Sequence, residues 1–97
     1  MRIIRQHIHI NGIVQGVGFR PFIYRIAKQC HLSGFVNNNS SGVYIEIQGP
    51  ADSIEIFHKK LLNETPPFAT IISVLKENAD VLQDSDFKII DSDSSGP

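Results

Sequence analysis

Apolar and polar residues alternate in two stretches of the chain, residues 7–13 and residues 43–48, and this alternation predicts strands with one buried face. The apolar positions that would share the buried face are Ile8, Ile10, Val43, Ile45 and Ile47. Three further segments, residues 35–38, 70–76 and 87–90, have the apolar and β-branched content of short strands. Turn-forming residues separate 35–38 from 43–48, which predicts an antiparallel hairpin.

Two other segments repeat their apolar residues at the spacing of a helix. The repeating positions are Phe22, Ile23, Ile26, Ala27 and Cys30 in the first segment, and Ile54, Phe57 and Leu61 in the second. Pro21 suits the first turn of the first helix, where a missing N–H costs nothing. Gly34 is predicted to end that helix, and Pro66 and Pro67 the second.

The predicted order is therefore β-α-β-β-α-β with a short extra strand. It indicates an α+β, ferredoxin-like two-layer sandwich in which both helices cover one face of an antiparallel sheet. The strand residues above would meet Phe22, Ile26, Phe57 and Leu61 in the core. A chain of 97 residues is long enough for one domain, predicted over residues 1–91. Residues 92–97 are polar and predict a flexible linker tail toward further domains.

Composition narrows the functional classes. Charged residues make up 20% of the chain, the net charge is -1, and Lys and Arg are scattered, so no basic patch predicts nucleic-acid binding. No apolar run approaches the roughly 20 residues of a membrane helix. The N-terminus lacks the features of a signal peptide. A single cysteine, Cys30, allows no intrachain disulfide, and a cytoplasmic location is expected.

Candidate chemistry gathers between the first strand and the first helix. The segment consists of Val14, Gln15, Gly16, Val17, Gly18, Phe19 and Arg20. Two glycines allow the backbone to curl so that its N–H groups form an anion-binding nest. The following helix adds the positive end of its dipole, and Arg20 a planar guanidinium that suits phosphate oxygens. Spacing alone leaves open a plain glycine-rich connection with a solvated arginine.

Residues 12–20, together with residues 34–38 and 41–43, resemble the paired motifs of acylphosphatases. The resemblance spans roughly residues 7–90. It implies the ferredoxin-like fold and metal-independent cleavage of the carboxyl–phosphate bond of acyl phosphates. Residues 20–22 and 66–71 are also similar to the N-terminal domain of the carbamoyltransferase family of hydrogenase maturation. That similarity implies carbamoyl phosphate as substrate, downstream carbamoyl-transfer domains, and maturation proteins as partners.

Carried onto this sequence, the resemblance implies that Arg20 binds the phosphoryl group and that Asn38 orients the attacking water. Asn37 and Asn39 flank that position and remain alternatives. Residues 15–20 would bind the substrate, and no metal or cofactor is expected. An acyl phosphate has a good leaving group, so alignment and charge stabilisation suffice. Ile13 departs from the family, which often has a basic residue there, and this difference would weaken phosphate attraction.

Two functional classes follow, an acyl phosphate hydrolase and a gating module that binds carbamoyl phosphate or phosphate but turns over poorly alone. A purely structural domain is a third, weaker interpretation. His7 and His9 share one strand face, but a metal site needs more ligands than two. Tyr44 beside them suggests an RNA-stacking surface, yet the aromatic-rich strand motif of RNA-recognition domains is missing.

Overall fold

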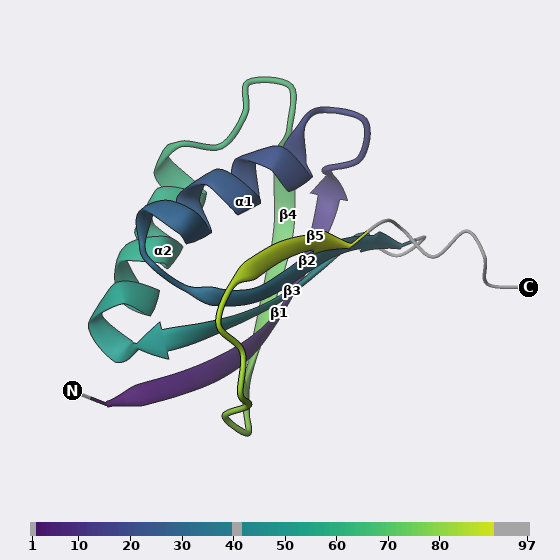
Figure 1. The fold of residues 1–97 in the computed structure, drawn as a ribbon. Coiled ribbons are helices and arrows are strands. Elements are labelled where there is room, and N and C mark those ends of the chain that lie inside the picture. Colours follow the sequence, from purple (N-terminus) through teal and green to yellow (C-terminus); the bar gives the residue numbers. More distant parts are fainter. Residues whose placement is uncertain (1, 40–41, 91–97) are drawn as a thin grey trace, which may run out of the picture.

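The structure is a computed structural model that describes residues 2–39 and 42–90. Its elements, in chain order, are β1 (Ile3–Ile13), α1 (Phe19–Gln29), β2 (Ser33–Asn39), β3 (Gly42–Pro50), α2 (Ala51–Asn63), β4 (Thr70–Ala79) and β5 (Phe87–Ile90). Both helices lie on one face of the sheet, and the other face, the open face, has no helix of the described residues over it (Figure 1). The predicted linker, residues 92–97, and the turn residues 40–41 lie outside the described residues. Within the described residues, neither helix has the length and apolar character needed to span a bilayer.

The sheet has the strand order β4-β1-β3-β2-β5. The pairs β1–β3, β1–β4 and β2–β3 are antiparallel, so the predicted ferredoxin-like α+β sandwich is confirmed. The prediction of a wholly antiparallel sheet is wrong for β5, which runs parallel to β2. The reason is topological: residues 80–86 carry the chain from β4 at one edge to β5 at the other, and β5 therefore enters in the direction of β2.

The core fills the space between the helices and the sheet. Every residue predicted to form it is buried: Ile8, Ile10, Val43, Ile45, Ile47, Phe22, Ile26, Phe57 and Leu61. The register explains this result, because Ile8 pairs with Ile45 and Ile10 with Val43, which places their side chains on the same face. Phe19, Val36 and Phe87 extend the core, and burial of these apolar groups is the main force that holds the two layers together.

Helix α1 ends earlier than the sequence predicts. His31 has a φ of 56° and takes the left-handed conformation that terminates many helices. Its N–H donates to the Lys28 carbonyl (3.0 Å), and the N–H of Leu32 donates to the Ala27 carbonyl (3.0 Å). Gly34, the predicted stop, instead lies inside β2, where an added Cβ would come within 2.0 Å of the Glu46 carbonyl oxygen. Its lack of a side chain serves strand packing, and the prediction of a helix end there is wrong.

His58 on α2 gives the fold a testable pH dependence. The half-buried ring donates from Nε2 to Oε1 of Gln6 (2.8 Å), and burial, with the nearby charge of Lys76, lowers its pKa to about 4. The unfolded chain binds this proton below about pH 6.5, so stability falls as the pH drops from that value towards about 4. Between these two pH values, the free energy of unfolding measured in urea should fall by about 1 to 2 kcal/mol, after allowance for solvent screening. The variant His58→Gln should lack this fall. If the free energy of unfolding fell equally with pH in the wild type and in His58→Gln, His58 would not be the group responsible.

Candidate active site

The sheet topology brings the two predicted site segments to one end of the molecule. Strands β1 and β2 are both antiparallel to β3, so their last residues lie beside the first residues of β3. Residues 14–18 leave β1 at this end and lead into α1, while Asn38 is the last but one residue of β2. Figure 1 shows the loop rising from the tip of β1 into the helix layer.

The loop is fixed at both ends and open in the middle. Val14 and Phe19 are each only 1% exposed and belong to the core. Between them, Gly16 (φ 72°) and Gly18 (φ 75°) adopt the left-handed conformation, which other residues rarely take. A Cβ at either glycine would meet nothing within 4 Å. Backbone conformation, and not crowding, therefore requires these glycines, and the space around them is free for a ligand.

The backbone N–H groups of this loop make few hydrogen bonds within the part of the chain that the structure describes. Within residues 2–39 and 42–90, those of Gly16, Val17, Gly18, Phe19 and Arg20 donate to no backbone carbonyl, and the first bond of α1 runs from Phe22 N–H to the Gly18 carbonyl (3.2 Å). The N-cap is a glycine without a side-chain cap, and the first turn of the helix holds no acidic residue. This helix start is an uncompensated positive end, the arrangement that binds anions in many proteins.

Arg20, the second residue of α1, is half-buried. Among the described residues its guanidinium has neither a hydrogen bond nor an ion pair. The contrast with buried Arg5 is clear, because Arg5 contacts Glu46, Gln48 and Asp84. The five N–H donors of Arg20 are therefore available to a ligand at the start of the helix.

Strand register separates the candidate asparagines. Asn38 pairs with Val43, and Val36, two residues earlier, is fully buried, so the Asn38 side chain lies on the helix side of the sheet. Its Oδ1 is buried and has no hydrogen-bond partner within the described residues, which is rare for such an atom. Asn37 pairs with Tyr44 and lies on the open face. Asn38, and not Asn37, therefore shares the side of the sheet on which the loop leads to α1.

The other predicted binding residues contribute mainly backbone. Phe19 is buried in the core and Val17 packs against it, so these residues can offer only their N–H groups to a ligand. Gln15 is exposed and makes contacts within the protein. On the open face, His7 contacts the Tyr44 hydroxyl and Glu46 (3.2 Å), away from the loop. No three His, Cys, Asp or Glu side chains of the described residues gather as a metal site requires.

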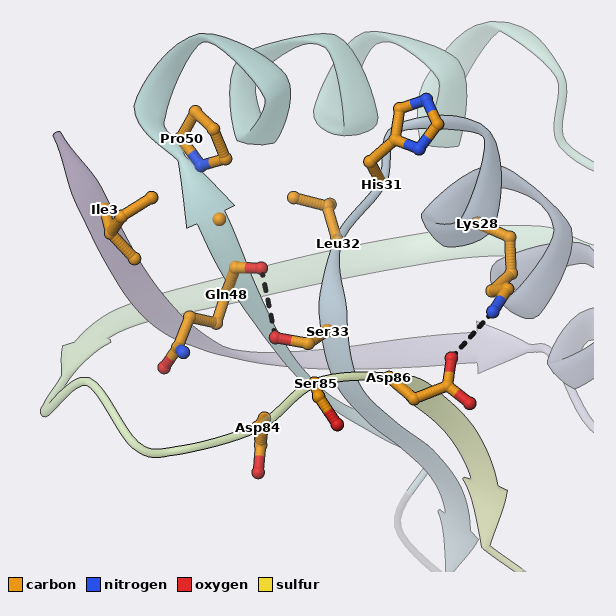
Figure 2. A pocket seen from close by; sticks show the side chains of 11 residues that line it. Ile3, Lys28, His31, Leu32, Ser33, Gln48, Pro50, Asp84, Ser85 and Asp86 are labelled. Atoms are coloured by element: carbon orange, nitrogen blue, oxygen red, sulfur yellow. Dashed lines mark hydrogen bonds and ion pairs between the residues drawn. The ribbon is translucent and has the colours of Figure 1, made fainter. Parts of the chain in front are cut away.

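A cavity of about 430 Å³ lies at the opposite end of the sheet. Its lining includes the first residues of β2 and the last residues of β3. Figure 2 shows two polar contacts within its lining: Lys28 contacts Asp86 (2.6 Å) and Ser33 Oγ donates to the Gln48 carbonyl (3.5 Å). We place the candidate site at the loop end of the sheet instead, where the N–H groups of residues 16–20, the Arg20 guanidinium and Asn38 Oδ1 have no partner within the described residues.

Known proteins of one family resemble this chain over most of its length. Residues 6–89 match the family model of acylphosphatase. The acylphosphatase of Caldivirga maquilingensis is 40% identical over 83 residues, which span 84% of this chain and 86% of that protein. An acylphosphatase structure from Coxiella burnetii superposes with a TM-score of 0.83 at 36% identity, covering 91% of this chain and 93% of that one. The chain belongs to the acylphosphatase family.

Within the family, the chain is also similar to one domain of much larger proteins. Carbamoyltransferase HypF2 of Cupriavidus necator is 40% identical over 95 residues, which is 97% of this chain and 12% of that protein. A crystal structure of full-length HypF in a phosphate- and nucleotide-bound form superposes with a TM-score of 0.90 at 41% identity, over 96% of this chain and 13% of that chain. The chain thus spans about an eighth of the length of these two HypF proteins.

Proposed function

We propose that this domain hydrolyses small acyl phosphates to a carboxylate and inorganic phosphate. The observation that carries the proposal is a set of polar groups at one end of the sheet that have no partner within residues 2–39 and 42–90. These groups are the N–H donors of residues 16–20, the guanidinium of Arg20 and the buried Oδ1 of Asn38. The donors match a phosphoryl group, and the amide oxygen is an acceptor that a water molecule can fill.

Each group then has a defined role. The loop N–H groups and Arg20 bind the phosphoryl oxygens and stabilise the charge that develops on them. Asn38 accepts a hydrogen bond from a water molecule and so directs the oxygen of that water at phosphorus. The new oxygen–phosphorus bond forms as the bond from phosphorus to the acyl oxygen breaks. The carboxylate leaves with the electron pair of the broken bond. One proton of the water passes to a phosphoryl oxygen, and the other stays on the new hydroxyl of the phosphate.

Carbamoyl phosphate is the substrate we propose for a longer parent protein, with carbamate and phosphate as products. The similarity to HypF proteins over nearly the whole chain supports this choice. In that parent, residues 1–91 would be the N-terminal acylphosphatase-like domain and residues 92–97 a linker. The carbamoyl-transfer domains and the hydrogenase-maturation proteins would be its partners, in the cytoplasm.

A gating module is the second candidate. The same donors would hold carbamoyl phosphate or product phosphate even in a domain with little turnover, so Arg20 has the same role in both interpretations. Asn38 distinguishes them, because an orphan acceptor for water serves hydrolysis and not anion binding. Its buried Oδ1, which has no hydrogen-bond partner in the part of the chain that the structure describes, favours the hydrolase.

Steady-state assays of the wild-type domain test the proposal. Benzoyl phosphate, acetyl phosphate and carbamoyl phosphate should each release phosphate, with no loss of rate in EDTA. p-Nitrophenyl phosphate, a monoester with a poorer leaving group, is the matched control and should react far more slowly. Binding of inorganic phosphate without turnover of any acyl phosphate would favour the gating module. Loss of activity in EDTA that Mg²⁺ restores would contradict the metal-independent mechanism.

A further inference from the structure

Residues 80–86 form a strap that connects β4 at one edge of the sheet to β5 at the other. All seven residues are exposed, and none of them belongs to a helix or strand. Figure 1 shows the strap passing below the sheet and rising into β5. Such a segment buries little apolar surface, so polar contacts must fix its position.

Those contacts come from several elements. Buried Arg5 on β1 binds Asp84 through Nη1 (2.6 Å) and Glu46 through Nε (2.8 Å). Gln48 on β3 donates from Nε2 to the Leu82 carbonyl (2.7 Å) and accepts the Leu82 N–H at Oε1 (2.8 Å). Gln48 thus pairs with the strap as a neighbouring strand would.

The strap is also fastened where it enters β5. Lys28 on α1 contacts the Asp86 carboxylate (2.6 Å), as Figure 2 shows. The N–H of Gly34 on β2 donates to the Asp86 carbonyl (2.9 Å). Together with the contacts of Leu82 and Asp84, these bonds form a clamp that sets the start of β5 against β2.

The pairing of β5 with β2 connects the clamp to the proposed site. The register of β5 on β2 runs from Gly34–Phe87 to Asn37–Ile90, and it ends one residue before Asn38. Without β5, β2 would be an edge strand, and Asn38 would lie near its frayed end. The loop of residues 14–18 does not depend on the strap in this way, because buried Val14 and Phe19 hold it.

We propose that the strap clamp is a positioning device for Asn38, with Asp84 and Asp86 as positioning residues. The inference rests on the proposed hydrolase function. The clamp fixes β5, β5 supports the last residues of β2, and the Asn38 amide thereby keeps the orientation that directs water. Loosening the strap should therefore impair the chemical step while phosphate binding, which the loop provides, is retained.

The test is the double variant Asp84→Ala/Asp86→Ala. Its kcat for benzoyl phosphate should fall about tenfold, since small misplacements of a catalytic group are costly. The inhibition constant of inorganic phosphate should change less than twofold. Asp80→Ala, which removes an exposed carboxylate of the same strap that has no partner in the described residues, is the matched control and should behave as wild type. A second double variant, Asp84→Glu/Asp86→Ala, keeps a carboxylate near Arg5 and should recover part of the lost rate.

Amide hydrogen exchange gives a second readout that needs no activity. In the double variant, the amides of residues 35–38 should exchange faster while those of α1 stay protected. An unchanged kcat despite faster exchange would overturn the positioning role, as would an equal loss of phosphate binding. An inactive wild-type domain would refute the proposed hydrolase, and unchanged exchange in the double variant would then refute the clamp separately.

Discussion

Replacing Arg20 with alanine should lower kcat/KM for benzoyl phosphate by about 10³-fold, because two or more charge-assisted hydrogen bonds to the phosphoryl group are lost. Arg20 lies in the first turn of α1, and its guanidinium has no hydrogen bond or ion pair among the described residues, so it can bring a positive charge to a phosphoryl group there. The dissociation constant of inorganic phosphate should rise with the loss of rate, since the same donors bind ground state and transition state. Phosphate binding is measured by calorimetry and rate by steady-state assay.

Arg25→Ala is the matched control for this experiment. Arg25 lies on the same helix, is exposed, and places its guanidinium 5.6 Å from the centre of the Phe22 ring. Its removal changes net charge by the same amount and should leave kcat/KM within about twofold. Arg20→Lys keeps the charge but loses the planar fork, so an intermediate rate is expected. Equal effects of the Arg20 and Arg25 variants would mean that general electrostatic attraction, and not a specific contact, governs binding.

Replacing Asn38 with alanine should reduce kcat by about 10² to 10³-fold, the cost of removing one polar group that acts in a transition state. Phosphate binding should stay within about twofold of wild type, because the loop and Arg20 are untouched. Within the described residues, Asn38 Oδ1 is buried without a hydrogen-bond partner, so the variant loses no hydrogen bond from this atom. Its free energy of unfolding in urea should fall by no more than a small side-chain truncation costs.

Asn37→Ala provides the comparison for Asn38. The two residues are neighbours of the same type, but Asn37 lies on the open face beside Tyr44. Its replacement should leave kcat nearly unchanged. A large loss of rate in the Asn37 variant with normal rate in the Asn38 variant would exchange their proposed roles.

The parts of the fold that follow from local patterns could be predicted from the sequence. Alternation at Ile8 and Ile10 and at Val43, Ile45 and Ile47 defines a buried face, because side chains of a strand point alternately to its two sides. The curl at Gly16 and Gly18 could be predicted too, since glycine tolerates positive φ.

Features that depend on distant contacts could not be predicted. Arg5 and Asp84 are separated by 79 positions, and nothing local in residues 80–86 signals that this strap crosses to the opposite edge and adds a parallel strand. The end of α1 at Gln29 could not be predicted, because the left-handed conformation that follows it is taken by His31 and not by a glycine. To know on which side of the sheet Asn38 lies, one needs its pairing with Val43 on β3, and no short sequence motif contains that pairing.

Titration of the ¹⁵N-labelled domain with inorganic phosphate is the most direct measurement of whether the loop binds a phosphoryl group. The account predicts that the backbone amide signals of Gly16, Gly18, Phe19 and Arg20 shift together with one dissociation constant, and that Arg20→Ala weakens this constant strongly. Shifts confined to the cavity lined by Lys28 and His31, or none at the loop at saturating phosphate, would contradict it.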